Sequence, residues 1–157
     1  MEVSDCDHCT TILTDRKISA EYFSFHTTDA EYQLLEKIRH TPKTKSLAGN
    51  ADFALGIVTG NNKKYISSVK NKDNEVILKG SDICKYHTNP NSNYIVFNPQ
   101  NFQQVAPIEM YRAPEKLLYR FISSQLVFAY DDKQTLSLNS CNLVIPKLEG
   151  LHIKYIQ

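Results

Sequence analysis

The polar residues best suited to chemistry lie together in the segment Thr59-Gly60-Asn61-Asn62-Lys63-Lys64. This segment offers a hydroxyl, two amides, a glycine backbone and two ammonium groups, which are donors and acceptors that suit nucleic-acid base edges and phosphates. The same residue types are also common in solvent-exposed turns, and composition alone favours a turn with no ligand, because turn chemistry needs no ligand to explain it.

The neighbouring residues predict how this segment is held. Residues 53–58 are an apolar run typical of a buried strand, and residues 65–69 read as a returning strand. Because Gly and Asn tolerate positive φ, residues 59–62 predict a tight hairpin turn between the two strands.

A second group of residues could bind a metal. Cys6 and Cys9 form a CxxC, and Cys84 and His87 form a CxxH. Three thiolates and one imidazole would make a tetrahedral zinc site. The two halves are far apart in sequence and a single CxxC is a weak pattern, so unrelated free cysteines in a reducing cytoplasm remain the other interpretation.

Motifs of common enzyme classes are absent from the sequence. It contains no HExxH, no G-x-G-x-x-G and no Gly-Lys-Ser/Thr phosphate-binding loop. The adjacent pair Asp131-Asp132 makes a poor acid/base couple, because neighbouring strand or turn positions point apart. The residues alone therefore predict a basic, β-rich binding module.

The charge is distributed unevenly along the chain. Residues 1–36 carry two basic and eight acidic residues (2 − 8 = −6), whereas residues 37–157 carry sixteen and nine (16 − 9 = +7). This predicts an acidic segment and a basic body that could approach a polyanion, although acids clustered on a solvated face would give the same pattern. The acidic N-terminus is not a signal peptide and no run is long enough for a membrane span, so we expect a cytoplasmic protein with no membrane partner.

The remaining pattern predicts an α+β, β-rich fold with mixed or antiparallel twisted sheets, a few short helices and one longer N-terminal helix. Thr28 and Glu31 form a capping box at the start of this helix, and Tyr32, Leu35 and Ile38 predict a face packed on a core. Further strands are predicted at 76–78, 94–97, 116–121, 126–130, 135–139 and 143–145.

Four blocks follow one another after residue 50: residues 51–63, residues 78–83, residues 116–122, and residues 128–132 with Asn139-Ser140. In order and spacing they resemble the C-terminal target-recognition region of TaqI-like adenine-specific DNA methyltransferases, and the specificity part of fused Type II restriction-modification enzymes. The resemblance implies that residues 28–157 are a DNA target-recognition domain truncated at its C-terminus. Residues 1–27 would be an acidic arm or the tail of a preceding domain.

The catalytic Asn/Asp-Pro-Pro-Tyr/Phe motif and the cofactor-binding motif of these enzymes are absent. The resemblance therefore implies a non-catalytic fragment whose parent is an adenine methyltransferase or a Type II restriction enzyme. The parent would bind S-adenosylmethionine and flip the adenine out of the duplex. The expected partners are double-stranded DNA and the methyltransferase domain of the same parent chain, with no cofactor in the fragment itself.

The resemblance also implies roles for single residues: lysines on phosphates, Asn and Thr on base edges, and an arginine on guanine. The candidate DNA-binding residues are Thr59, Gly60, Asn61, Asn62, Lys63, Lys64, Lys79, Lys85, Lys116 and Arg120. The alternative hypotheses are a protein-interaction module and a zinc-bound structural module, neither of which binds DNA.

Overall fold

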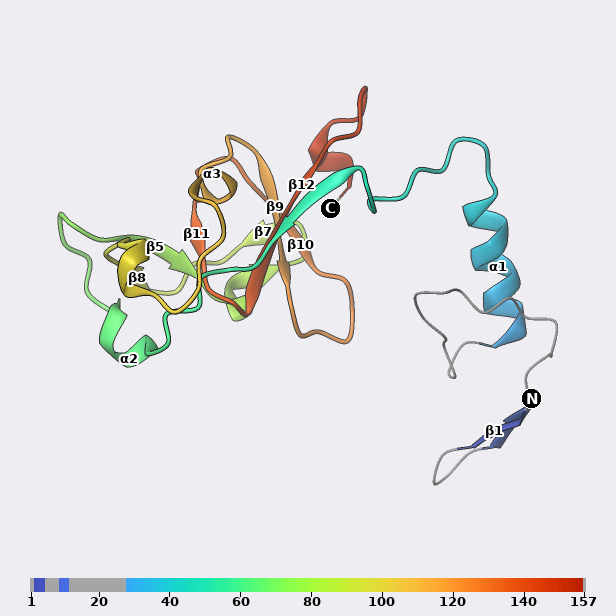
Figure 1. Cartoon of the computed structure of the whole chain (residues 1–157), viewed down its shortest axis with the longest axis horizontal. Coiled ribbons are helices and arrows are strands. Elements are labelled where there is room, and N and C mark those ends of the chain that lie inside the picture. Colours follow the sequence, from blue (N-terminus) through green and yellow to red (C-terminus); the bar gives the residue numbers. More distant parts are fainter. Residues whose placement is uncertain (1, 5–8, 12–27, 157) are drawn as a thin grey trace. The chain divides into compact units, whose positions relative to one another are not determined.

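The computed structural model describes residues 2–4, 9–11 and 28–156. The chain divides into two compact units, Met1–Ser46 and Leu47–Gln157 (Figure 1). This division lies at a different place from the predicted domain boundary after residue 27, which stays a prediction.

The first unit contains one long helix, α1 (Asp29–Arg39), and two short antiparallel strands, β1 (Glu2–Ser4) and β2 (Cys9–Thr11). The predicted capping box of α1 is confirmed, because Thr28 N donates to Glu31 Oε2 at 2.8 Å and Glu31 N donates to Thr28 Oγ1 at 3.3 Å. The hydrogen bonds that Thr28 N and Thr28 Oγ1 donate to Glu31 Oε2, at 2.8 and 2.9 Å, hold the pKa of the Glu31 carboxyl below its usual value.

The prediction that one face of α1 packs on a core is wrong. Leu34, Leu35 and Ile38 are exposed, and α1 has no buried residue. Helical periodicity marks a face that can pack, but burial requires a second surface. No described residue of the first unit supplies that surface.

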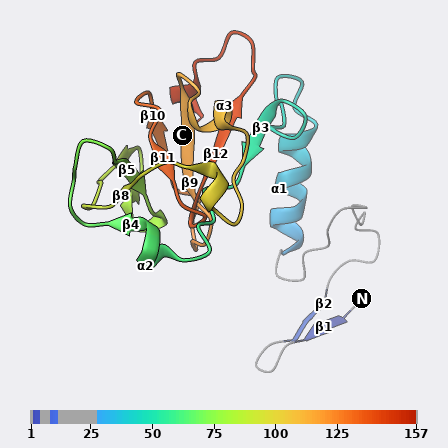
Figure 2. The same ribbon diagram turned by 60° about the vertical axis from the view of Figure 1, so that its left-hand side comes forward.

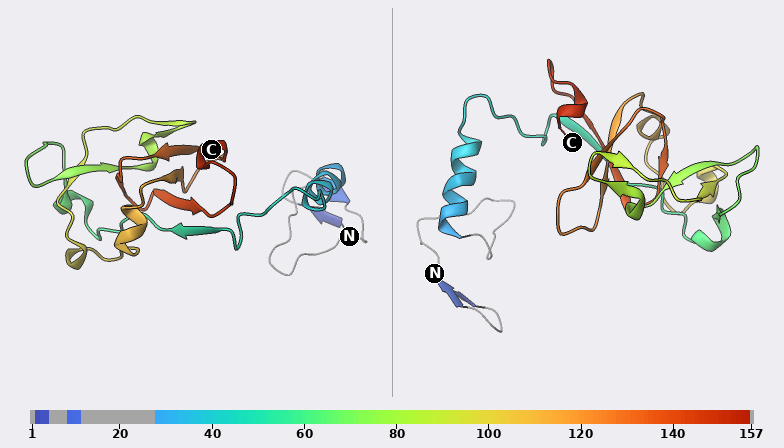
Figure 3. Two further views of the ribbon diagram at one scale, coloured as in Figure 1. Left: turned by 90° about the horizontal axis from the view of Figure 1, so that it is seen from above. Right: turned by 180° about the vertical axis from the view of Figure 1, so that it is seen from behind.

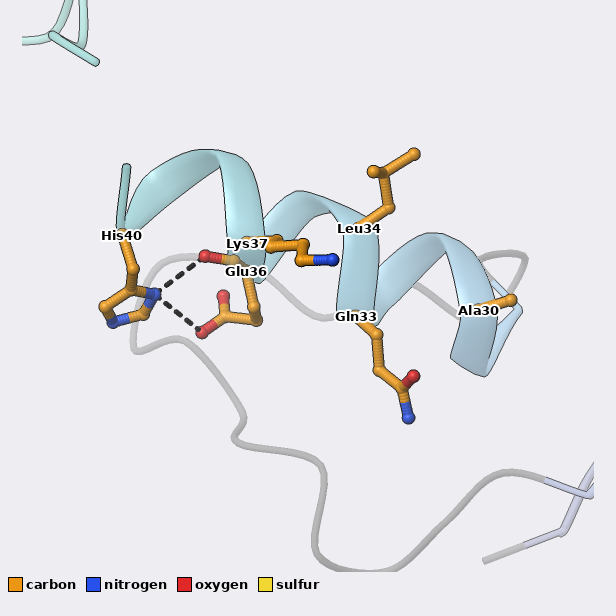
Figure 4. A pocket seen from close by; sticks show the side chains of 6 residues that line it. All are labelled: Ala30, Gln33, Leu34, Glu36, Lys37 and His40. Atoms are coloured by element: carbon orange, nitrogen blue, oxygen red, sulfur yellow. Dashed lines mark hydrogen bonds and ion pairs between the residues drawn. The ribbon is translucent and has the colours of Figure 1, made fainter. Parts of the chain in front are cut away.

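A hollow runs along α1, but all of its lining residues belong to this one helix or its C-cap (Figure 4). They are Ala30, Gln33, Leu34, Glu36, Lys37 and His40. His40 Nδ1 lies 2.7 Å from the Glu36 carbonyl oxygen and 3.9 Å from Glu36 Oε2, so this ring closes the C-terminal end of the helix. The hollow is therefore a feature of the helix surface, without groups converging from elsewhere.

The second unit is built from two four-stranded sheets and a hairpin. The first sheet is antiparallel, in the order β10 (Phe128–Asp131), β9 (Lys116–Arg120), β12 (Cys141–Pro146) and β3 (Ala51–Ala54). The second is mixed, in the order β11 (Leu136–Ser137), β5 (Glu75–Leu78), β8 (Tyr94–Ile95) and β4 (Ile66–Ser67), with β11 parallel to β5. The hairpin pairs β6 (Ile83–Cys84) with β7 (His87–Thr88). Strands β3 and β12 lie side by side although they come from opposite ends of the unit (Figure 3).

Only single helical turns accompany these strands. They are α2 (Asn62–Tyr65), α3 (Ile108–Tyr111) and the 3₁₀ turns Gly80–Asp82, Pro99–Asn101 and Ile153–Tyr155. The predicted α+β, strand-rich class is confirmed. Within the residues that the structure describes, no helix has both the length and the apolar character that crossing a bilayer requires.

The first sheet is buried on both faces, because successive residues of a strand point to opposite sides. Leu118 of β9 and Leu143 of β12 pack into the larger core, which also takes residues of the second sheet. Leu117 and Val144, one position along, pack on the other face with Ile153. Burying each such side chain contributes about 1.5–3 kcal/mol to folding.

Close backbone contacts lead the chain from β3 to the polar turn at residue 59. A Cβ on Gly56 would lie 2.1 Å from the Leu138 carbonyl oxygen, so only glycine fits there. Ile57 N then donates to Ser137 O at 2.7 Å, and Val58 N donates to Gln104 O at 2.9 Å. The residues before Thr59 are therefore fixed to the centre of the second unit.

Candidate nucleic-acid interface

The segment from Thr59 to Lys64 is a turn held by its own side chains. Thr59 Oγ1 donates to Asn62 Oδ1 at 2.6 Å, and Asn61 N donates to Thr59 Oγ1 at 3.2 Å. Asn61 Oδ1 caps α2 by accepting from Lys64 N at 3.2 Å. Gly60 has φ +76°, which a residue with a side chain rarely adopts. Thr59 itself is buried, so its hydroxyl supports the turn from below.

The predicted β-hairpin at this segment is wrong. Residues 57–58 form bridges with Leu138 and Gln104, and the following strand β4 pairs with β8. The physical reason is the Asn61 side chain, which caps a helical turn where the prediction had a two-residue hairpin loop. The prediction that polar groups are displayed at an exposed turn does not depend on the type of turn.

Four exposed side chains of this turn point their remaining polar groups to solvent: Asn61, Asn62, Lys63 and Lys64. Among the described residues, the two amide nitrogens have no hydrogen-bond partner. Lys64 Nζ lies 5.0 Å from the centroid of the Tyr65 ring, and this ring packs edge-on against Phe102 at 5.4 Å. The core therefore anchors the base of the turn while its cations and amide donors stay available.

Lys79 lies beside a second capped turn. Its backbone N–H donates to Asp82 Oδ2 at 2.8 Å, and the buried Asp82 carboxylate also accepts a short hydrogen bond from Asn91 Nδ2. Gly80 N donates to Ser140 Oγ at 3.0 Å. Asp82 is therefore a structural carboxylate, and Lys79 is half-buried at the start of the turn.

Lys85 lies at the tip of the β6–β7 hairpin, with its Nζ 5.2 Å from the centroid of the exposed Tyr86 ring. Cys84 and His87 pair across this hairpin as neighbouring partners. Cys6 lies outside the described residues, and no cluster of three or more His, Cys, Asp or Glu that could hold a metal is found in the described part of the chain. The zinc set of Cys6, Cys9, Cys84 and His87 stays a weak candidate.

Two candidate residues of β9 are engaged inside the protein. Lys116 is 0% exposed, and its Nζ lies 2.6 Å from Asp131 Oδ2 and donates to Tyr111 O at 2.8 Å. The prediction that Lys116 contacts DNA is therefore wrong, because its ammonium group is held in the core and no phosphate can reach it. Arg120 is half-buried, and its Nε donates to the Ile83 carbonyl at 2.8 Å, which ties β9 to the β6–β7 hairpin.

The α2 turn lies next to β4 of the second sheet, whereas the connection between β9 and β10 extends from the first sheet (Figures 1 and 2). The β6–β7 hairpin packs beside that connection, because Tyr86 N donates to Phe128 O at 2.9 Å. We call the hairpin and this connection, residues 83–88 and 121–127, the basic edge.

Sequence reasoning missed the apolar part of the basic edge. Phe121, Ile122 and Leu126 are exposed in the β9–β10 connection. The predicted strands 116–121 and 126–130 had included Phe121 and Leu126 as strand residues. The available signal was the run Ser123-Ser124-Gln125, which is typical of a turn and leaves the flanking apolar residues at a tip.

Comparison with known proteins places this arrangement in a family. One curated relative, the Type II methyltransferase M.VspI from Vibrio sp. (strain 343), is 38% identical over 63 residues, which are 40% of this chain and 15% of that protein. The chain thus spans a small part of the relative that it matches. The family described as TaqI-like C-terminal specificity domain matches residues 75–157, which include three of the four sequence blocks noted above. The chain belongs to the family of TaqI-like C-terminal specificity domains.

Proposed function

We propose that the second unit reads duplex DNA for a restriction-modification enzyme and orients it for adenine methylation. Family membership supports a target-recognition role in such a system. The observation that carries the proposal further is the α2 turn, where two ammonium groups and two amide donors stand on a turn that is anchored to the core.

The proposed contacts with DNA are of two kinds, to phosphates and to base edges. Lys63, Lys64 and Lys85 are exposed and neutralise phosphates, which sets affinity and register without reading sequence. The amide nitrogens of Asn61 and Asn62 reach base edges. Since both amide oxygens already accept a hydrogen bond inside the turn, the groups on offer are donors, which suit acceptors such as guanine O6 and N7 or thymine O4.

The chemistry itself belongs to polypeptide beyond this chain. The sequence lacks the methyltransferase motifs, so S-adenosylmethionine binds to the methyltransferase part of the parent enzyme. M.VspI is named a Type II methyltransferase, and a similar parent would unite the two parts. This chain then contributes orientation and sequence selection, and no catalytic residue.

The salt dependence of DNA binding tests this function. We expect the wild-type chain to bind mixed-sequence duplex DNA, with an affinity that falls as salt rises. Lys63→Ala and Lys64→Ala should each weaken binding to all sequences and lower the slope of log K against log salt by about one unit. Fluorescence anisotropy over a salt series measures both quantities.

Lys133→Ala is the control for these variants. Lys133 is exposed and follows the end of β10 that lies opposite the β9–β10 connection, because Asp131 pairs with the first residue of β9. Its removal lowers the net charge equally but should leave the slope unchanged. Equal slopes for all three variants would show that charge alone drives binding and that the α2 turn is outside the interface.

A further inference from the structure

The connection between β9 and β10 exposes three large apolar side chains within six residues. Phe121 is 61% exposed, Ile122 is 87% exposed and Leu126 is 83% exposed. Only Ser123, Ser124 and Gln125 lie between them, so the tip has no charge. Single apolar residues on a surface are common, but three on one tip indicate a surface that meets a partner.

The base of this tip is held by backbone hydrogen bonds. Arg120 N donates to Val127 O at 3.3 Å, and Phe121 N donates to Ser140 O at 3.2 Å. Within the tip, Gln125 N donates to Ser123 Oγ at 3.4 Å. The apolar side chains are therefore presented by a hairpin that is tied to Ser140, the residue immediately before β12.

Cationic and aromatic groups lie beside the base of the tip. Arg120 immediately precedes it and is bound to Ile83 of the β6–β7 hairpin. That hairpin places Tyr86, which is 56% exposed, and the neighbouring Lys85 beside the start of β10. Residues 83–90 and 120–130 contain no Asp or Glu. An apolar tip flanked by Lys85 and Arg120, on segments that contain no acidic residue, matches a polyanion better than an average protein surface.

We propose that the tip of residues 121–126 is a wedge that inserts Ile122 and Leu126 between base pairs of the bound duplex, while Lys85 lies against the adjacent phosphates. Architectural proteins use Phe, Leu and Ile side chains in this way to unstack a base step and bend the DNA. Pyrimidine–purine steps unstack most easily, so they are the preferred place of insertion. This inference rests on the proposed function, because it requires a DNA-bound second unit.

The experiment uses the full chain and duplexes that carry 2-aminopurine after thymine at a TA step, since the fluorescence of this base rises when it is unstacked. We expect a fluorescence rise on binding. Ile122→Ser and Leu126→Ser should each reduce that rise and weaken binding about tenfold, because an apolar side chain no longer leaves water on insertion. Their salt slope should equal that of the wild type, because no charge is changed.

Val69→Ser is the matched control. Val69 is 68% exposed on the connection between β4 and β5, so its substitution removes a similar apolar side chain from another part of the unit. This variant should bind and unstack DNA as the wild type does. Since Ile122, Leu126 and Val69 are all exposed, none of the substitutions removes core packing, and circular dichroism confirms the fold of each variant.

The outcomes distinguish failure of the wedge proposal from failure of the proposed function. Wild-type fluorescence and affinity in Ile122→Ser and Leu126→Ser, with the lysine effects on the salt slope intact, would overturn the wedge and leave the proposed function standing. Absence of any DNA binding by the wild-type chain would overturn both. If Ile122→Ser and Leu126→Ser unstack DNA as the wild type does but lose self-association, or lose binding to a methyltransferase polypeptide, the tip is a protein-docking surface and the wedge is overturned.

Discussion

Lys116 and Asp131 form a buried ion pair whose polar groups are well satisfied. Beside the 2.6 Å contact between them, Lys116 Nζ donates to Tyr111 O, and Asp131 accepts from Thr135 N at 2.9 Å and from Thr135 Oγ1 at 2.6 Å. Burial lowers the pKa of Lys116, while the hydrogen bond and charge of Asp131 act in the opposite direction. The pair thus joins β9 to β10 at the end of the sheet away from the basic edge.

Lys116→Met should lower the free energy of unfolding by about 3–5 kcal/mol, because it leaves the Asp131 carboxylate buried without its counter-charge. Urea unfolding followed by circular dichroism measures the change. Adding Asp131→Asn to Lys116→Met removes the orphaned charge and should recover a large part of the loss. The surface variant Lys133→Met should stay within about 0.5 kcal/mol of the wild type.

The lowered pKa of Lys116 also predicts a pH dependence. Between this lowered pKa and the usual value of 10.5, the unfolded chain binds more protons at Lys116 than the folded chain does. The contribution of this group to stability therefore rises with pH across that window. The difference in unfolding free energy between the wild type and Lys116→Met isolates the contribution of Lys116. If this difference narrows as pH rises towards 10.5, the pKa of Lys116 is not lowered in the folded protein.

Single-turn elements of this protein depend on side-chain caps. An isolated helical turn is unstable in water because nucleation orders several residues for one hydrogen bond. In α2 the missing stabilisation comes from the Asn61 cap and from Tyr65 on Phe102. In the 3₁₀ turn at Gly80–Asp82, it comes from the Asp82 carboxylate on Lys79 N. Each cap therefore determines where the lysines next to it are placed, Lys63 and Lys64 in α2 and Lys79 at the 3₁₀ turn.

Substitutions of Asn61 should separate its structural role from its proposed role in DNA binding. Asn61→Ala removes the cap of α2 and should lower the free energy of unfolding by about 1 kcal/mol, as measured by urea unfolding. Asn61→Asp keeps an oxygen acceptor for Lys64 N, so it should restore stability. Because it also loses the amide donor and adds a negative charge, Asn61→Asp should still weaken DNA binding in anisotropy measurements. Full DNA affinity in Asn61→Asp would restrict this residue to capping.

The two compact units differ in charge and in core. Residues 47–157 carry twelve basic and nine acidic residues, a net charge of +3, whereas residues 1–46 carry six and eight. The predicted charge of +7 over residues 37–157 therefore includes four basic residues that lie in the first unit. Both hydrophobic clusters belong to the second unit. The basic edge gains its character from local placement of cations, because the net charge of the unit is small.

A chain that begins at Leu47 should fold by itself, since it keeps both clusters and both four-stranded sheets. We expect cooperative thermal unfolding with a midpoint within about 4 °C of the intact chain, as followed by circular dichroism. It should also bind mixed DNA slightly more tightly, because removing residues 1–46 raises the net charge from +1 to +3. Loss of cooperative unfolding would show that the first unit completes the core.

Local neighbours decide some features of this protein, and the sequence by itself determined those. The capping box of α1, the central positions of the strands and the strand-rich class follow from residues a few positions apart. The exposed position of Lys63 and Lys64 was predicted, although the predicted hairpin turn was wrong. Only the tertiary structure decided that Lys116 is buried against Asp131, that Leu34 of α1 stays exposed and that Ile122 and Leu126 form an apolar tip. These outcomes depend on which distant segments meet. A side chain is buried only where another segment covers it, and residue spacing along the chain does not specify that segment.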